Sequence, residues 1–375
     1  MSGIYVHIPF CSKACHYCDF HFSTSLNLVE GVISCIQIEL KKKKHLLSNK
    51  TIKSIYFGGG TPSAIHHDFI FDILNTIKEN FNLSKNIECT IEMNPDNVSP
   101  ELIRKYYDNG INRVSLGVQS FRDCDLLYMN RSHDGKQAIE SLEILSKSRI
   151  NNLNVDLIYG YPTLDDKSWI ENLKILTGFN VHHISCYCMT VEKKTALEFL
   201  IKKKKLRPLE PDTGARQFKI ARDFLTRNKF THYEISNYSI KNFKSVHNQN
   251  YWNHSNYIGV GPSAHSFVDN LRQWNINNNK KYCDQIHAGK KFYQKEKLNR
   301  KNIFNEYIFM NLRSFKGLDI SHCYKQLKPN EIKDFNNEIK KLENLNVLRK
   351  KNNLIYLNEK GMLISDNISS RLFLV

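Results

Sequence analysis

The chain has 375 residues, of which 41% are hydrophobic and 11% aromatic, and its formal net charge is +17. This length predicts two or three domains, and the apolar content excludes an intrinsically disordered chain. No segment approaches the ~18 uninterrupted apolar residues of a membrane-spanning helix. The N-terminus lacks a basic region followed by an apolar segment, so we expect a cytoplasmic protein.

Short β-type runs alternate with longer helical stretches in the first half of the chain, which is typical of βα units around a parallel sheet. The expected strands cover residues 4–8, 54–57, 87–93, 113–117, 153–158 and 183–189. Helices are expected between them at 28–40, 67–80, 100–109, 135–148 and 167–176. The third helix has Ser99 as its N-cap, Pro100 in its first turn and Gly110 after its end. The pattern predicts the α/β class.

The second half of the chain has a different pattern. A helix is expected at 212–228, and a segment rich in His, Asn, Tyr and Trp follows at 232–275. From about residue 302 the periodicity predicts two helices, a hairpin at 347–357 and a final helix from Glu359, an order similar to a winged-helix module. We therefore expect three parts, at 1–230, 231–300 and 301–375.

Three of the ten cysteines, Cys11, Cys15 and Cys18, lie directly after the first expected strand. Their C-x-x-x-C-x-x-C spacing on a strand-to-helix loop suits a [4Fe-4S] cluster with one iron left open for another ligand. The alternatives are a zinc site completed by His16 or Asp19 and a loop of unliganded thiols. The cluster is favoured because both alternatives leave the rest of the chain unexplained.

Glycine and polar residues recur at the C-terminal ends of the expected strands, where parallel barrels place their active sites. The second strand ends in GGGTP at 58–62, the third in EMNP at 92–95 and the fourth in GVQS at 117–120. Arg131 follows the fourth strand, and Asp156 lies in the fifth. Each feature alone is typical of a turn or an ion pair, but their recurrence predicts a binding site.

These motifs together resemble the radical S-adenosylmethionine superfamily, and in particular the family of oxygen-independent coproporphyrinogen III dehydrogenase and related heme chaperones. The resemblance covers essentially the whole chain and rests on YVHIPFCSKACHYCDF at 5–20, FGGGTPS at 57–63, VSLGVQSF at 114–121 and DLIYGYP at 156–162. It implies a partial (β/α)6 barrel with a C-terminal helical and winged-helix-like module.

The resemblance implies that Cys11, Cys15 and Cys18 hold the cluster. It further implies that S-adenosylmethionine is bound by Tyr5, Gly59, Gly60, Thr61, Glu92, Gln119, Arg131 and Asp156. In this family the reduced cluster cleaves the sulfonium to methionine and a 5′-deoxyadenosyl radical, while the protein orients the cofactor. The reactivity therefore belongs to the cofactors, and no side chain is expected to be catalytic by itself.

Two features favour the heme-chaperone branch of the family. The dehydrogenase motif continues as C-x-C, whereas Asp19 and Phe20 follow Cys18 here. The chain also begins only a few residues before its first expected strand, without the N-terminal extension of the dehydrogenase.

The sequence HNQNYW at 247–252 matches the H-N-x-x-Y-W motif of the heme chaperones. The match implies that heme is bound by His247, Asn248, Tyr251 and Trp252, since a neutral imidazole can ligate iron and aromatic rings can cover a porphyrin. The alternative is a packed aromatic turn with a hydrogen-bonded histidine. His254 and His265 are rival iron ligands outside the motif.

The resemblance therefore implies a chaperone that delivers heme to apo-hemoproteins, such as membrane respiratory enzymes. The alternative within the family is the oxidative decarboxylation of coproporphyrinogen III. The basic charge would favour an anionic membrane surface, although much of it comes from dispersed lysines. A nucleic-acid-binding or nucleic-acid-modifying protein is the alternative of another class, but the sequence has no recognition motif beyond charge.

Overall fold

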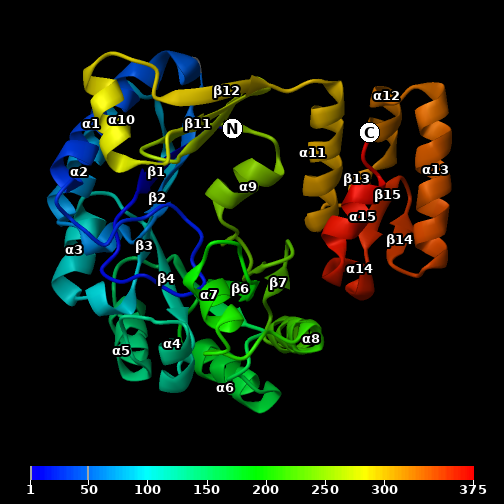
Figure 1. Cartoon of the computed structure of the whole chain (residues 1–375), viewed down its shortest axis with the longest axis horizontal. Coiled ribbons are helices and arrows are strands. Elements are labelled where there is room, and N and C mark those ends of the chain that lie inside the picture. Colours follow the sequence, from blue (N-terminus) through cyan, green and yellow to red (C-terminus); the bar gives the residue numbers. More distant parts are fainter. Residues whose placement is uncertain (1, 49) are drawn as a thin grey trace.

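The computed structural model describes residues 2–48 and 50–375, and its centre is a twelve-stranded sheet. Six consecutive parallel strands form the middle of the sheet: β1 (Ser2–Ile8), β2 (Ile52–Gly59), β3 (Leu83–Met93), β4 (Arg113–Gln119), β5 (Leu153–Tyr159) and β6 (His183–Cys188). All six strands were predicted, and they confirm the α/β class. Figure 1 shows helices covering one side of this sheet.

The connecting helices are α1 (Val29–Lys43), α2 (His67–Asn80), α3 (Pro100–Asp108), α5 (Gly135–Ser146) and α6 (Asp166–Thr177), as predicted. Helix α3 begins as expected, because the Ser99 hydroxyl accepts a hydrogen bond from the backbone N–H of Leu102 at 3.2 Å. The sequence analysis missed α4 (Asp123–Tyr128), because six residues are too few to show a helical period. It also missed three 3-10 turns, η1 (Lys44–Leu47), η2 (Pro62–Ala64) and η3 (Pro95–Asn97).

The parallel strands carry apolar side chains on one face and polar side chains on the other. On the apolar face, Val6, Phe57, Ile91 and Val114 lie side by side in register and are fully buried. Their burial against the helices stabilises the fold through the hydrophobic effect. The opposite face carries Tyr5, Tyr56, Thr90 and Arg113 in register, together with the residues two positions before and after each of them. We call this polar surface the inner face.

Further strands extend the sheet at both edges. Beside β1 lies the parallel strand β9 (Asn256–Val260), and beyond it run the antiparallel strands β10 (His265–Val268), β11 (Leu271–Asn275) and β12 (Tyr293–Lys297). Beside β6 lie β8 (Asn237–Ser239) and β7 (Thr231–His232). In the described part of the chain β1 and β6 do not pair with each other, so the six strands form an open, partial barrel. These edge strands were not predicted, because they are short and interrupted by turns.

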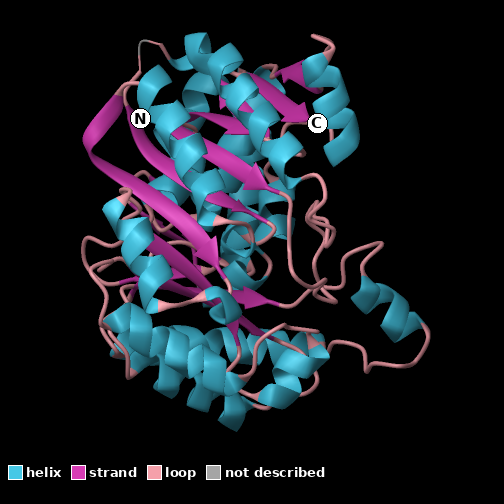
Figure 2. Cartoon of the chain, turned by 90° about the vertical axis from the view of Figure 1, so that its left-hand side faces the viewer, coloured by secondary structure: helices cyan, strands magenta, loops and turns pink. Residues whose placement is uncertain are grey.

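Four more helices lie in or beside this extended sheet: α7 (Ala196–Lys202), α8 (Pro211–Arg227), α9 (Val246–Trp252) and α10 (Asn279–His287). Helix α8 confirms the helix expected at 212–228. Figure 1 shows α9 between the sheet and the C-terminal helices, and Figure 2 shows one short helix standing out from the body on two loops, which corresponds to α7 at the front of Figure 1. Helix α9 therefore lies close to the inner face.

The C-terminal part is helical with a three-stranded sheet, and helices precede a hairpin as expected, although three helices and a short strand stand where two helices were predicted. Its elements are α11 (Arg300–Arg313), β13 (Leu318–Asp319), α12 (Ile320–Gln326), α13 (Pro329–Asn344), β14 (Leu348–Lys351), β15 (Leu354–Leu357), α14 (Glu359–Leu363) and α15 (Ser365–Arg371). The predicted final helix is thus two short ones. Among the described residues, no helix is both long and apolar enough to cross a bilayer.

Candidate functional site

The three cysteines lie on the loop between β1 and α1, at the edge of the sheet where the parallel strands have their C-terminal ends. Cys11, Cys15 and Cys18 are all half-buried, so their thiols remain within reach of a ligand. The loop is held against the next strand, because Thr61 donates its backbone N–H to the Phe10 carbonyl at 2.7 Å. A β-carbon at Gly60 would lie only 2.6 Å from the same carbonyl oxygen, so the close approach requires glycine there.

A second set of contacts anchors the middle of the cysteine loop to the segment after β4. The imidazole of His16 hydrogen-bonds the Tyr128 carbonyl through Nδ1 at 2.8 Å, and Asn130 donates to the Ala14 carbonyl at 2.7 Å. The guanidinium of Arg131 donates through Nη1 to Cys15 Sγ at 3.3 Å. The loop is therefore fixed from both sides, and a cation faces one of its sulfur atoms.

The arrangement of the thiols distinguishes a cluster from a single metal ion. Three sulfur ligands of one zinc ion, each about 2.3 Å from it, would lie roughly 4 Å apart. Among the described residues, Cys11, Cys15 and Cys18 do not form a group whose sulfur atoms all lie within 4.8 Å of one another, nor do they with His16 or Asp19. These positions do not match one zinc ion, and the C-x-x-x-C-x-x-C spacing remains the argument for a [4Fe-4S] cluster.

Burial changes the acidity of these thiols. Desolvation raises the pKa of Cys11 to about 11, partly offset by a hydrogen bond with Thr61, and it raises the pKa of Cys18 to about 12. Both thiols are therefore protonated near neutral pH in the absence of a metal. Iron binding would release those protons, because the thiolate is the metal ligand.

The residues predicted at the strand ends form two connected groups beside the loop. In the first, Glu92 accepts hydrogen bonds from the Tyr56 hydroxyl at 2.7 Å and from the Gly59 N–H at 3.2 Å. In the second, the Asn94 side chain links the Thr61 hydroxyl, at 3.4 Å, to Arg131 Nη2, at 2.7 Å. The structure thus brings both groups to the same end of the sheet as the cysteines.

Two buried polar atoms of this region have no partner among the described residues: Gln119 Oε1 and Arg131 Nε. Gln119 also has a φ of 68°, in the left-handed region that non-glycine residues rarely adopt. A buried polar atom without a hydrogen bond is costly unless a ligand or water satisfies it. These atoms fit a polar ligand such as S-adenosylmethionine.

Two carboxylates of the inner face, Glu92 and Asp156, are desolvated. Burial raises the pKa of Glu92 to about 7, although the hydrogen bond from Tyr56 opposes the change. Burial also raises the pKa of Asp156, against hydrogen bonds that include Ser115 at 3.1 Å and Asn154 at 2.7 Å. Such acceptors suit the amine or hydroxyl groups of a bound ligand. Tyr5 lies nearby and hydrogen-bonds His7 Nδ1 at 3.1 Å.

The segment 247–252 lies in helix α9, which packs on the inner face near the N-terminal ends of the strands. His247 is only 1% exposed, and its ring hydrogen-bonds the Ser54 hydroxyl through Nδ1 and the Tyr251 hydroxyl through Nε2, each at 2.9 Å. The Glu88 carboxylate accepts from the backbone N–H groups of Val246 and His247, each at 2.9 Å. Of the other motif residues, Asn248, Tyr251 and Trp252 are half-buried.

Sequence reasoning missed several polar partners of the site, including Tyr56 and Asn94. A signal was present in the alternation of the strands, since Ser54, Tyr56 and Gly58 occupy one face of β2 while Ile55 and Phe57 occupy the other. The same alternation occurs in β3 and β4. Polar residues at every second position of several adjacent strands predict a polar inner face.

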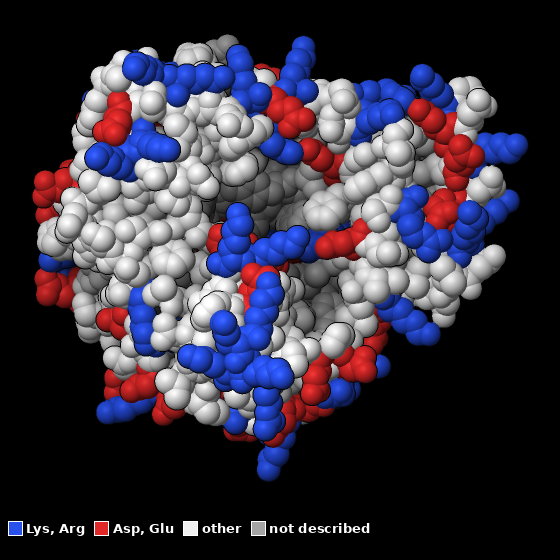
Figure 3. Space-filling view, viewed as in Figure 1, with Lys and Arg blue, Asp and Glu red and all other residues white. Residues whose placement is uncertain are grey.

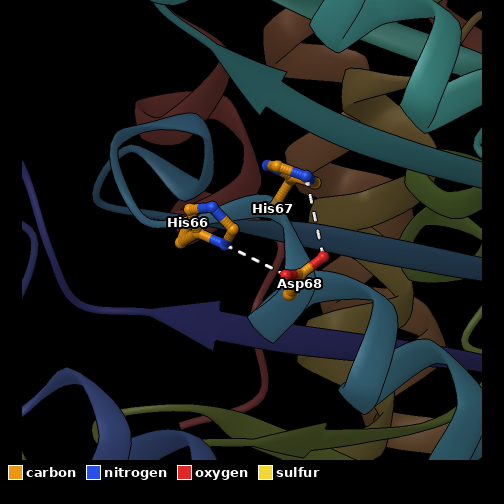
Figure 4. A group of neighbouring side chains, drawn as sticks. All are labelled: His66, His67 and Asp68. Carbon is orange, nitrogen blue, oxygen red and sulfur yellow. Dashed lines mark ion pairs between the residues drawn. The ribbon is translucent and has the colours of Figure 1, made fainter.

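Another group of metal-ligand side chains lies outside this site, at the start of α2. His66, His67 and Asp68 bring one ligand atom each to within 4.8 Å of one another (Figure 4). Asp68 pairs with His66 at 3.4 Å and with His67 at 3.6 Å, and His66 and Asp68 are largely exposed. The ion pairs already account for this cluster, which serves below as a control for metal binding.

Comparison with known proteins agrees with this geometry. Residues 5–176 match the model of the radical SAM superfamily, and residues 298–364 match that of the HemN C-terminal domain. The solved structure of coproporphyrinogen III oxidase (HemN) from Escherichia coli has a TM-score of 0.84 at 21% identity, covering 99% of this chain and 90% of that chain. The fold and the cysteine loop therefore define a radical SAM protein.

Two relatives narrow the family. The heme chaperone HemW of Lactococcus lactis is 29% identical over 373 residues, which cover 100% of this chain and 97% of the relative. The heme chaperone HemW of Buchnera aphidicola from Acyrthosiphon pisum is 32% identical over 332 residues, covering 85% of each chain. The chain belongs to the HemW family.

Proposed function

We propose that this protein is a heme chaperone that binds a [4Fe-4S] cluster, S-adenosylmethionine and heme, and that it passes heme to apo-hemoproteins. The observation that carries the proposal is the similarity to HemW proteins along the whole chain. The position after Cys18 supports it, since Asp19 and Phe20 stand where the dehydrogenase motif continues to another cysteine.

In this proposal Cys11, Cys15 and Cys18 hold the cluster, which when reduced can supply one electron to S-adenosylmethionine. Arg131 stabilises the thiolate of Cys15 by donating a charge-assisted hydrogen bond to it. The unpartnered Gln119 Oε1 and Arg131 Nε give the cofactor one acceptor and one donor. The remaining contacts would come from Tyr5, Gly59, Gly60, Thr61, Glu92 and Asp156.

The heme-binding part of the proposal involves helix α9 and its surroundings. Asn248, Tyr251 and Trp252 are half-buried and offer amide and aromatic surface to a porphyrin. His247 is the motif's candidate for the iron ligand, but both of its ring nitrogens are engaged. Ligation by His247 would therefore require one of two changes. Either α9 moves away from Ser54, or the side chain of Tyr251 turns away from the ring.

We also propose a division into a radical SAM core at 1–230, a heme-motif segment at 231–300 and a C-terminal module at 301–375. The acceptors would be apo-hemoproteins, among them membrane respiratory enzymes. The exposed lysines 202–205, which begin with the last residue of α7, would favour a peripheral contact with an anionic membrane from the cytoplasmic side. In Figure 3, Lys and Arg gather near the middle of the face on which α7 lies.

One experiment separates the chaperone from the dehydrogenase. The full chain, with its cluster reconstituted anaerobically, is supplied with reductant and S-adenosylmethionine, and then with coproporphyrinogen III or with heme. We expect stable heme uptake, transfer to an added apo-hemoprotein and no decarboxylated porphyrin by mass spectrometry. Formation of protoporphyrinogen IX with no heme uptake would overturn the proposal in favour of the enzyme.

A further inference from the structure

We propose that the axial ligand of the heme iron is His265, at the start of β10, rather than the histidine of helix α9. This assignment rests on the proposed heme-chaperone function and adds to it the residue that contacts the iron. Three observations support it: the free ring nitrogens of His265, the course of β10 across the inner face, and the indole ring of Trp274 beside His265.

Three histidines compete for the role, and they differ in the freedom of their ring nitrogens. Both nitrogens of His247 are hydrogen-bonded, and its side chain is 1% exposed. His254 hydrogen-bonds Glu306 through Nε2 at 2.8 Å, and its ring stacks on Phe267 at a centroid distance of 4.6 Å. His265 is exposed, and in the described residues its ring nitrogens have no hydrogen-bond partner. Among the described residues, only the last of these three rings has both nitrogens free of hydrogen bonds, whereas His254 keeps Nδ1 free but is held by Glu306 and Phe267.

The backbone places His265 on the inner face. Gly259 of β9 lies in register with Tyr5 of β1, so a side chain at this position would point to the inner face. A β-carbon there would lie 2.1 Å from the carbonyl oxygen of His265. Strand β10 therefore begins directly over the inner face, at the level of Tyr5, and this crossing requires glycine at position 259.

The ring of His265 is exposed but lies beside other polar side chains of this face. Desolvation lowers the pKa of His265, with a smaller contribution from Arg272, although the ring is exposed to solvent. The His265 ring also lies near enough to His7, on the inner face of β1, to contribute to the lowered pKa of that histidine.

The residues around His265 have side chains that suit a porphyrin. A neutral imidazole is the form that ligates heme iron, and the lowered pKa keeps His265 neutral near pH 7. The ring of Trp274, directly opposite on β11, lies nearly parallel to it, with an interplanar angle of 22° and a centroid distance of 6.4 Å. An indole beside the ligand offers apolar surface to the macrocycle.

The test is a titration of the cluster-loaded full chain with ferric heme, followed by absorbance and electron paramagnetic resonance. His265→Ala should weaken heme binding on the order of tenfold or more and remove the signature of imidazole ligation. Free imidazole should restore that signature in His265→Ala, and His265→Met should give a different, thioether-ligated spectrum. The control His322→Ala removes an exposed histidine of α12 and should leave binding unchanged.

The outcomes separate this assignment from the function on which it rests. Wild-type protein that binds no heme would overturn the chaperone function, and the ligand assignment with it. Wild-type protein that binds heme, together with His265→Ala of equal affinity and unchanged spectrum, would overturn the assignment alone. Loss of imidazole ligation in a folded His247→Ala variant, with His265→Ala unaffected, would transfer the role to His247.

Discussion

The cysteine loop and helix α9 both adjoin the inner face, but their polar atoms are satisfied to different degrees. Around the loop, the thiols are half-buried, and the side chains of Gln119 and Arg131 each have a buried atom without a partner in the described part of the chain. In α9, His247 is buried with both ring nitrogens bonded, and Glu88 accepts from two backbone N–H groups of the first turn. Asn250 Oδ1 is the exception in α9, because it is buried without a partner among the described residues. The first region is arranged to receive a ligand, whereas the second stabilises the barrel in this conformation.

The largest expected effect concerns the cysteine loop. Replacing any one of Cys11, Cys15 or Cys18 with Ala should abolish the cluster, because each thiolate would hold a different iron. Anaerobic reconstitution should give about four irons and four sulfides per wild-type chain, and the variants should lose the cluster's absorbance and paramagnetic signals.

Two controls accompany this measurement. Cys124→Ala removes an exposed cysteine, and the double variant His66→Ala/His67→Ala removes the separate metal-ligand group of α2. Both should keep the full iron content. Stoichiometric zinc without iron–sulfur absorbance in the wild-type protein would contradict the prediction, because the cysteine loop would then hold a single ion and not a cluster.

The next effect tests whether α9 is structural. His247→Ala should lower the free energy of unfolding by about 2–4 kcal/mol, because it leaves a cavity and unpaired hydroxyls at Ser54 and Tyr251. Chemical denaturation with the cluster absent measures this change directly. Unchanged stability would show that the packed conformation of α9 contributes little.

A smaller effect is expected at the carboxylates of the inner face. Glu92→Ala and Asp156→Ala should each weaken S-adenosylmethionine binding by about 1–3 kcal/mol, because each removes an acceptor from a desolvated site. Calorimetry on the cluster-loaded protein provides the measurement. Glu101→Ala is the matched control, since this carboxylate is exposed on α3 and pairs only with Lys105. Equal affinity in all three variants would place the cofactor elsewhere.

The smallest effect, counted per pH unit, is the pH dependence of stability that His247 contributes. Burial lowers its pKa to about 3, whereas in the unfolded chain it titrates near 6.5. Below about pH 6.5 the unfolded state therefore binds the extra proton, and stability falls as pH decreases toward 3. His247→Gln should flatten this dependence by at most about 1.4 kcal/mol per pH unit. If the free energy of unfolding fell equally with pH in the wild type and in His247→Gln between about pH 7 and pH 5, His247 would not be the buried, neutral group described here.

The sequence predicted that the cysteine loop and the strand-end residues lie at one end of the sheet, because their positions depend on local order along the chain. Six parallel strands in sequence bring their C-terminal ends to one edge, so the GGGTP motif and Glu92 had to lie near one another. The state of His247 could not be predicted in this way. Its partner Ser54 is 193 positions away and comes from another element, so no local pattern of α9 reports its burial.

The place of β1 in the sheet has a consequence for biosynthesis. Strand β1 pairs with β2, which ends at Gly59, and with β9, which begins only at Asn256. At roughly 5–20 residues per second, the ribosome needs on the order of 10 to 40 seconds between completing these two neighbours. Throughout that interval one edge of β1 has no partner, and unpaired edges promote aggregation. We therefore expect the nascent chain to depend on protection by the cell's general folding machinery until β9 emerges.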